Sequence, residues 1–395
     1  MRVDNHPSVV VAGHICLDLV IDFGSRPLDF AQAFRPGTLL EVGRPNLSAG
    51  GCVANTGLAL SRLGIQTQLI ARVGDDLFGR TIRELLEGFR PRPSISLSVA
   101  SEESTSYTVV VDPPHVDRLF LHFPGTNRSF RVSDVATPLP SGTRIFHFGY
   151  PPILPETFAD GGRALAGLLR EVRAAGVCVS LDMTLPDPGT AAGRVDWESW
   201  MAAVLPEVDV FLPSLAELGF MLGIEQIEPA DRPPELELLR DLSARSLGLG
   251  AGVVVLKLGA HGLYLRSSHD PARLSRLVQD SGAGPTGWEN RELFAPCLQV
   301  EVIGTTGAGD ATIAGFLASL VHGQTPEQAI RSAVTVGAFS VEGSQPASAI
   351  PSWAAVQERA RGRGPLRRDG VGVDGAMGRW NADGTVWDGR PRGAS

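Results

Sequence analysis

Short apolar runs alternate along the chain with segments in which apolar residues recur every three or four positions. The apolar runs are typical of buried strands, and they lie at 8–11, 67–74, 144–149, 177–182, 208–213 and 252–259. The segments with helical spacing lie at 57–64, 80–89, 161–176, 214–223, 311–323 and 325–343. Strands that are separated by helices favour a mainly parallel sheet covered on both faces, so we expect an α/β fold.

One part of the chain departs from this alternation. Residues 104–123 contain two β-rich runs separated by Asp112-Pro113-Pro114, which predicts an antiparallel hairpin added to the main sheet. Two polar or Gly/Pro-rich stretches, 225–235 and 267–292, are predicted to be surface insertions. Residues 361–395 are rich in Gly, Arg and Asp and have little aliphatic periodicity, so we expect a flexible tail after a domain at 1–360.

Composition and charge narrow the class of partner. The 395 residues are 43% hydrophobic and 20% charged, with a formal net charge of −8, which is typical of a globular protein. Acidic and basic residues are mixed, and no basic stripe is available to neutralise phosphates, so we expect no nucleic-acid partner. The sequence shows no signal peptide and no apolar run near the ~20 residues of a membrane helix. The four cysteines are scattered, which suits a reducing compartment, and we expect a cytoplasmic protein without membrane contact.

The segment VIGTTGAGDATIAGF (302–316) is the main candidate for chemistry. Backbone N–H groups of a glycine turn before a helix, together with the helix's positive end, form a site for an anion. A P-loop is excluded because the turn has no lysine, and the dinucleotide fingerprint is excluded because Thr312 replaces its third glycine. The remaining possibility is a phosphate cradle with Asp310 at its edge, which suits phosphoryl transfer to an alcohol whose proton the aspartate accepts. The alternative is that Asp310 only caps the helix.

Two further segments could bind a polyol. Gly50 and Gly51 allow a close approach of backbone to a ligand, and Asn55 in the following helical turn can both donate and accept hydrogen bonds. Asp18 follows the first strand, at the edge of an α/β sheet where ligands bind. The simpler interpretation of the Gly-Gly pair is a tight turn.

Together these segments resemble the ribokinase/PfkB family of carbohydrate kinases. The order matches the family: Gly-x-x-x-x-Asp (13–18), Gly-Gly-x-x-x-Asn (50–55), ARVGDDLFG (71–79), PGTN (124–127) and TTGAGD (305–310). The resemblance covers about residues 8–358. It implies a three-layer α/β/α sandwich with a mainly parallel sheet and a small β-sheet lid, whose segments we place at about 19–47 and 94–124.

The resemblance also implies an activity and a set of site residues. The activity is ATP-dependent phosphorylation of a hydroxymethyl group of a sugar or related polyol, with Mg²⁺ as cofactor. Asp310 is similar to the family's catalytic base, and the anion hole would comprise Gly307, Ala308 and Gly309. The implied sugar contacts are Asp18, Gly50, Gly51 and Asn55. The implied nucleotide contacts are Lys257, Gly259, Gly262, Ala338 and Val341. Lys257 is the chain's only lysine and could instead be an ordinary strand-end residue.

Three positions depart from the family pattern. Gly304 replaces the aspartate before the two threonines, so monovalent-cation activation is in doubt. Ser214 replaces the asparagine of an Asn-x-x-Glu segment, whose Glu217 would hold Mg²⁺ through water; Glu217 could instead be an ordinary first-turn helix residue. Thr312 replaces an aromatic residue, which we interpret as a packing change.

Other functions remain open at this stage. A nucleoside kinase on the same fold would need an apolar or aromatic slot for the base. A non-catalytic sugar or nucleotide sensor is favoured slightly by Gly304 and Ser214 and opposed by the intact Asp310. An interaction scaffold acting through the tail is the third alternative. A homodimer formed through the lid is also compatible with the resemblance.

Overall fold

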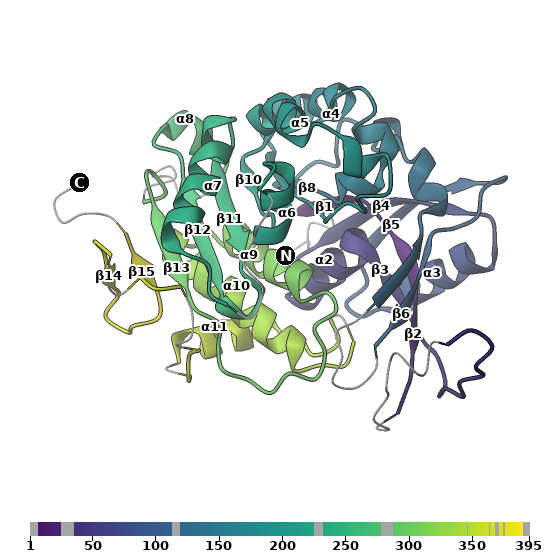
Figure 1. Cartoon of the computed structure of the whole chain (residues 1–395). Coiled ribbons are helices and arrows are strands. Elements are labelled where there is room, and N and C mark those ends of the chain that lie inside the picture. Colours follow the sequence, from purple (N-terminus) through teal and green to yellow (C-terminus); the bar gives the residue numbers. More distant parts are fainter. Residues whose placement is uncertain are drawn as a thin grey trace, which may run out of the picture.

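The computed structural model describes residues 7–24, 35–112, 119–224, 232–277, 287–345, 347–362, 364–367, 371–373 and 376–389 (Figure 1). The described strands form a large sheet and a small separate sheet, with helices packed against the large one. Among the described helices, none is long and apolar enough to cross a membrane.

The large sheet has eleven described strands in the order β14-β15-β13-β12-β11-β10-β9-β8-β1-β4-β5. The strands from β11 to β5 in this order pair in parallel, and the strands on the other side of β11 pair antiparallel. The parallel strands are β1 (Val9–Gly13), β4 (Thr67–Gly74), β5 (Ser94–Ala100), β8 (Ile145–Gly149), β9 (Cys178–Asp182), β10 (Val210–Phe211) and β11 (Val253–Lys257). The antiparallel strands are β12 (Leu263–Ser267), β13 (Glu292–Ala295), β14 (Arg379–Trp380) and β15 (Trp387–Asp388). The expected mainly parallel sheet is confirmed.

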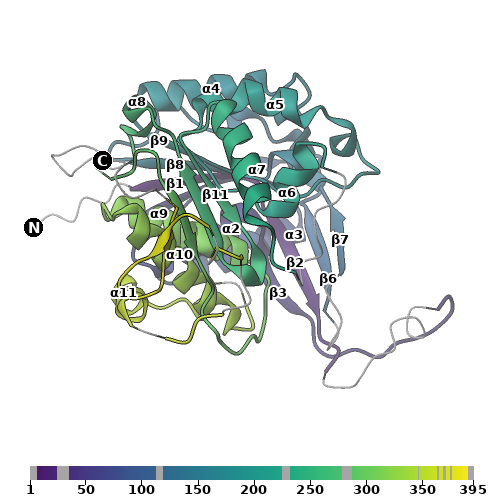
Figure 2. The same cartoon turned by 60° about the vertical axis from the view of Figure 1, so that its left-hand side comes forward.

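Helices cover both faces of this sheet, because strand side chains alternate between two apolar cores. In β1, Val9 and Val11 belong to one core, and Val10 and Ala12 belong to the other. The first core is shared with α2 (Gly51–Arg62), α3 (Leu77–Gly88), α9 (Ala308–Val321), α10 (Pro326–Val341) and α11 (Trp353–Arg361). The second core is shared with α4 (Arg163–Ala174), α5 (Trp197–Val204), α6 (Leu215–Met221) and α7 (Leu236–Gly248). Figure 2 shows these two helical layers on either side of the strands, and the short α8 (Pro271–Leu274) lies near α4 and α7.

The small sheet corresponds to the lid that the resemblance implies, and we call it the lid. Its order is β3-β2-β6-β7, with β2 (Cys16–Ile21), β3 (Asn46–Gly50), β6 (Tyr107–Val111) and β7 (Leu119–Phe123). The predicted hairpin is confirmed, because β6 and β7 pair antiparallel. The predicted lid boundaries need correction: residues 94–100 form β5, which pairs with β4 in the main sheet, and the first two lid strands lie at 16–21 and 46–50. Polar and apolar residues alternate in β5 because it is the half-exposed edge strand of the main sheet, and a lid strand would show the same alternation.

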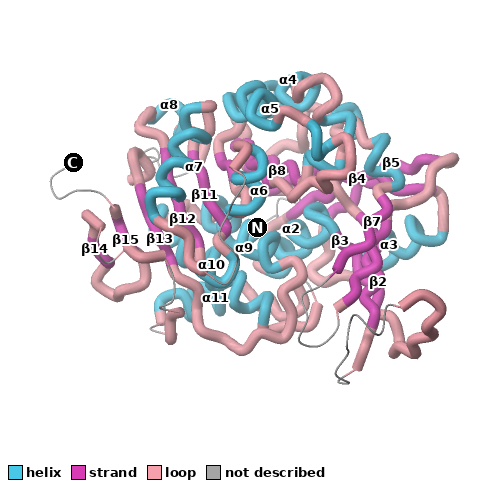
Figure 3. The backbone as a smooth tube through the Cα atoms, in the orientation of Figure 1, coloured by secondary structure: helices cyan, strands magenta, loops and turns pink. Residues whose placement is uncertain are grey.

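The tail differs from the flexible segment that its composition predicts. Among its described residues, β15 pairs antiparallel with β13 and extends the main sheet, and β14 pairs with β15 (Figure 3). Trp387 is 1% exposed, and Val371 and Val373 are also buried. These few apolar residues belong to one of the two apolar cores, so their burial fixes the segment, which local composition cannot reveal.

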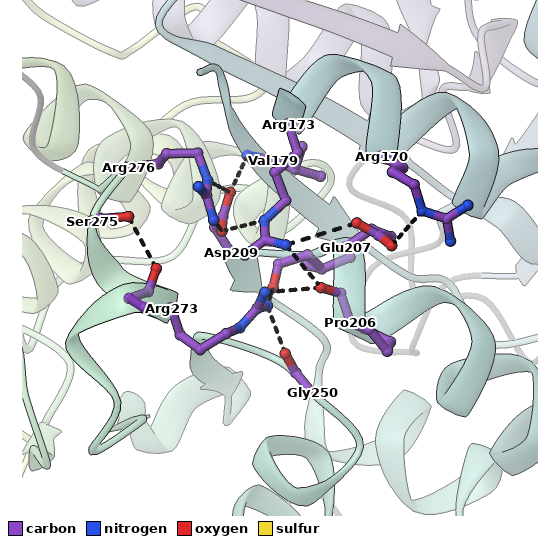
Figure 4. A network of polar contacts seen from close by, with 12 residues as sticks. Arg170, Arg173, Val179, Pro206, Glu207, Asp209, Gly250, Arg273, Ser275 and Arg276 are labelled. Carbon is purple, nitrogen blue, oxygen red and sulfur yellow. Dashed lines mark hydrogen bonds and ion pairs between the residues drawn. The ribbon is translucent and has the colours of Figure 1, made fainter. Parts of the chain in front are cut away.

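A buried ion network fixes the end of the sheet opposite to the carboxyl ends of the parallel strands. Asp209 is fully buried just before β10, and its carboxylate accepts from the Val179 N–H at 2.9 Å and from Arg173 and Arg276 at 3.2 Å each (Figure 4). Arg273 donates to the carbonyls of Pro206 at 2.8 Å and Gly250 at 2.6 Å. Burying a charged carboxylate is costly unless charged and hydrogen-bonding partners surround it. This network supplies those partners to Asp209 and thereby holds β9 and β10 in place.

Candidate active site

The glycine turn leads directly into α9, as its sequence predicts. Gly307 has φ of 71°, a left-handed conformation that favours glycine, and Ala308 is the first residue of the helix. Asp310 lies in the first turn of α9, but its side chain does not cap the helix. The simpler interpretation of Asp310 as a capping residue is therefore wrong.

The Asp310 carboxylate faces α2 and the end of β8. It accepts hydrogen bonds from Asn55 Nδ2 at 3.0 Å, from Thr56 Oγ1 at 3.3 Å and from the Tyr150 hydroxyl, which lies 3.0 Å from both oxygens. Asp310 is only 4% exposed, and burial raises the pKa of its carboxyl, although the charge of Lys257 and these hydrogen bonds oppose the rise. The structure thus brings Asn55 and Asp310 together across 255 residues of chain, as the resemblance implies.

Tyr150 is held in a backbone conformation that is unusual for a side-chain-bearing residue. Its φ of 65° and ψ of 47° lie in the left-handed region, which costs roughly 1–2 kcal/mol for a residue other than glycine. Such strain is found at functional sites when neighbouring contacts enforce it. Here the bond to Asp310 and a ring stack with His14, at 5.7 Å between centroids, fix the side chain. Sequence analysis missed Tyr150 because nothing local marks it.

Asp18 lies in β2, beside the Gly-Gly turn. Its carboxylate contacts Cys16 Sγ at 3.2 Å, and burial raises its pKa to about 6, with a smaller contribution in the same direction from the charge of Asp310. Gly50 directly faces this carboxylate, and a Cβ at position 50 would collide with it. Gly51, at φ of 85°, faces the His14 ring in the same way. The two glycines therefore do more than form a turn: they leave room for Asp18 and His14.

Two histidines complete this side of the site. His14 is 4% exposed, and neither of its ring nitrogens has a hydrogen-bond partner among the described residues. Burial and, to a smaller extent, the neighbouring His122 lower the pKa of His14 well below its usual value, so its ring is neutral. His122 lies on the lid strand β7, with its ring centroid 5.3 Å from that of His14, and its Nδ1 is 3.0 Å from Thr108 Oγ1.

A lysine lies between the turn and two acidic residues. Lys257 ends β11, and its ammonium lies 2.6 Å from Asp182, at the end of β9, and 3.9 Å from Glu217 in α6. Burial disfavours this charge, but the two carboxylates outweigh burial and hold the pKa of Lys257 above its usual value. The same side chain approaches Gly309. Lys257 is thus not an ordinary surface residue, and Asp182 is a site residue that sequence analysis missed.

The Ser214 substitution has a clear local role. Ser214 caps α6: its hydroxyl accepts from the Glu217 N–H at 3.2 Å, and its own N–H donates to the Glu217 carboxylate at 2.6 Å. Glu217 is therefore held in a capping box and beside Lys257 at once.

Asp182 Oδ2 is buried and has no hydrogen-bond partner among the described residues. No cluster of three or more potential metal-binding side chains occurs within the part of the chain that the structure describes.

A pocket of about 740 Å³ adjoins the glycine turn on the side away from the lid residues. All of the residues to which the resemblance assigns nucleotide contact line it, together with two residues of the turn: Lys257, Gly259, Gly262, Ala338, Val341, Ala308 and Gly309. Thr312 also lines the pocket and packs against Gly337 of α10, which accounts for a small residue at this position. The turn therefore separates this pocket from the carboxylates of Asp310 and Asp18.

Comparison with known proteins identifies the family of this chain. The family model for the pfkB family carbohydrate kinases matches residues 7–353. A probable fructokinase-7 from Arabidopsis thaliana is 26% identical over 353 residues, covering 86% of this chain and 92% of that protein. A nucleoside kinase from Methanothermobacter thermautotrophicus is 24% identical, covering 87% of this chain and 92% of that protein. The structure of an Arabidopsis thaliana ribokinase complexed with ribose and ATP has 19% identity and a TM-score of 0.63, covering 90% of this chain and 99% of that one. The chain therefore belongs to the PfkB family of carbohydrate kinases.

Proposed function

We propose that the protein transfers the terminal phosphoryl group of ATP to a hydroxymethyl group of a sugar or related polyol, with Asp310 as general base. The observation that carries this proposal is the position of Asp310. It lies on the helix that begins with the anion-binding turn, it is held by three side-chain donors, and it faces the side of the turn opposite to the 740 Å³ pocket.

The proposed chemistry divides between the turn and the carboxylate. The acceptor hydroxyl gives its proton to an Asp310 oxygen as its own oxygen bonds to phosphorus, and the bond from phosphorus to the leaving ADP oxygen breaks. Backbone N–H groups of Gly307, Ala308 and Gly309 would stabilise the charge on the transferred group. The raised pKa of Asp310 suits a base, because a more basic carboxylate accepts a proton more readily.

The residues around Lys257 fit a magnesium ion held partly through ATP. Carboxylate oxygens are the ligands that Mg²⁺ prefers, and in phosphoryl-transfer sites it uses one or two of them together with phosphates and water. Asp182, with its unpartnered Oδ2, and Glu217 are the residues that would hold it. When bound, Mg²⁺ would neutralise charge on the phosphates. A monovalent cation fits less well, because Gly304 offers no side-chain ligand.

The acceptor side of the site suits a neutral hydroxyl-rich molecule. A neutral His14 ring offers one donor and one acceptor, and the buried Asn55 Oδ1 is an acceptor without a partner among the described residues. Asp18 adds a carboxylate. A second candidate acceptor is a nucleoside, because the His14, His122 and Tyr150 rings provide a flat surface on which a base could stack.

Two measurements test the proposal. Purified protein is screened for ADP release with ATP, Mg²⁺ and a panel of sugars, polyols and nucleosides, and the best acceptor is then used with Asp310→Asn. We expect turnover in this variant to fall at least ~100-fold, the usual scale for a lost general base, while ATP binding is retained. Normal turnover in Asp310→Asn would refute the assignment, and ATP binding without turnover on any acceptor would favour the sensor.

A further inference from the structure

The chain continues beyond the region that the family model matches. That match ends at residue 353, within the first residues of α11. The Arabidopsis ribokinase aligns over 99% of its length with 90% of this chain. The described residues between 364 and 389, which we name the C-terminal extension, therefore follow the region that the family model matches.

The C-terminal extension lies against the wall of the 740 Å³ pocket. The Gln299 N–H donates to the Pro365 carbonyl at 2.8 Å, and the Arg367 N–H donates to the Cys297 carbonyl at 2.9 Å. Leu298 and Leu366 form an antiparallel bridge between these two bonds. Residues 297–300 line the pocket, so the extension pairs with the pocket wall itself.

The remainder of the extension is fixed to the body of the protein. Trp387 packs into the core beneath the sheet, and β15 pairs with β13, the strand that immediately precedes the pocket wall. Along the chain, the segment 364–367 follows α11 and precedes β15, and both of these elements pack on the body of the protein. This attachment gives the segment a defined position at the pocket.

Arg367 adds a positively charged residue to this wall. Among the described residues that line the pocket, Lys257 and Arg367 are the charged ones. Lys257 lies at the turn, where it contacts Asp182, whereas Arg367 is anchored beside Cys297. A guanidinium group binds phosphate oxygens through paired donors and also stacks on aromatic rings, and a nucleotide offers both.

We propose that the C-terminal extension is part of the nucleotide site and that Arg367 is a nucleotide-binding residue of this chain. The inference rests on the proposed function, in which ATP is the phosphoryl donor, and it takes this pocket as the ATP site because the implied nucleotide contacts line it. In this proposal, residues outside the family match contribute to the affinity for ATP. The described part of the tail is then a component of the nucleotide site and not a flexible appendage.

Direct binding of ATP tests this inference without a known acceptor. The dissociation constant of ATP with Mg²⁺ is measured by isothermal titration calorimetry for the wild type and for Arg367→Ala. We expect an increase of about tenfold, the equivalent of one charge-assisted contact. Arg379→Ala is the matched control, because Arg379 is an exposed arginine of the same extension on β14, and it should bind ATP like the wild type.

A second variant keeps the test independent of one side chain. A chain that ends at Arg361 lacks the whole extension and should bind ATP at least as weakly as Arg367→Ala; thermal denaturation without ATP shows whether it remains folded. A change of less than threefold in Arg367→Ala, in a variant that melts like the wild type, would overturn the inference. If the wild type itself binds no ATP, the proposed function fails instead.

Discussion

Replacing Tyr150 with phenylalanine removes one hydroxyl group and leaves the ring that stacks on His14. The hydroxyl lies 3.0 Å from each oxygen of Asp310, so its single proton is shared between them. This hydrogen bond lowers the pKa of Asp310 and opposes the effect of burial, which raises it. The Tyr150→Phe variant should therefore have an Asp310 carboxyl with a higher pKa than the wild type.

The size of the change follows from the strength of one hydrogen bond to a charged group. Such bonds contribute about 1.5–3 kcal/mol, and a shared proton belongs at the lower end of that range. One pKa unit corresponds to about 1.4 kcal/mol, so the pKa should rise by about one unit. A general base acts in its deprotonated form, so activity on the acid side should be lost at a higher pH in the variant.

The assay is the pH dependence of kcat/KM for the acceptor identified by the panel, since this ratio reports the free enzyme, in which the Tyr150 bond is present. We expect the acid limb to move upward by about one pH unit in Tyr150→Phe. Tyr264→Phe is the matched control, because it removes another tyrosine–carboxylate bond, 2.9 Å long, to Glu292. An acid limb unchanged to within 0.3 units (about 0.4 kcal/mol) would refute the reasoning.

Two further predictions follow from the acidic residues and from Gly304. Asp18 has a folded pKa of about 6, above the value near 3.9 of an unfolded aspartate, so its contribution to stability is fully present below about pH 4 and is lost as pH rises through 6. Asp18→Asn should therefore increase the free energy of unfolding by about 1–3 kcal/mol at pH 8 and by less at pH 5, and it should weaken acceptor binding. Urea denaturation at the two pH values checks the stability change, and equal effects at both would contradict the raised pKa of Asp18. Activity with Mg²⁺ should change less than about twofold when KCl replaces tetramethylammonium chloride at equal ionic strength, because Gly304 has no side chain to coordinate K⁺. Strong activation by K⁺ would disprove this expectation.

The glycine turn and the helix that follows it could be predicted because their evidence is local. Gly307 adopts the left-handed conformation that only glycine takes easily, and small and apolar residues after it continue as a buried helix. Most of the parallel strands were predictable for the same reason, since each is a short apolar run, whereas the polar, half-exposed β5 was not. Three helices, α5, α7 and α11, were missed; in α7 the buried Leu236, Leu239 and Leu242 recur every three positions, a helical spacing that was overlooked beside the polar stretch before it.

Asp182 and Tyr150 show what local patterns leave out. Asp182 ends β9 and Tyr150 directly follows β8, and nothing in either segment distinguishes the residue from a structural one. Their roles arise from strand order and helix packing: β10 alone separates β9 from β11, which places Asp182 beside Lys257, and α9 packs near the end of β8, which places Tyr150 beside Asp310. The same holds for Arg367, whose segment lies at the pocket wall through backbone pairing with residues about 70 positions earlier in the chain.

The sequence by itself therefore determined the alternation of strands and helices, the anion-binding turn and the residues that carry the family's motifs, because these depend on backbone preference and on spacing along the chain. The tertiary structure decided which side chains surround the base, which acidic residues neutralise Lys257 and where the C-terminal extension lies. Those contacts join residues as far apart as 255 positions, so they depend on strand order and packing rather than on any neighbouring residue.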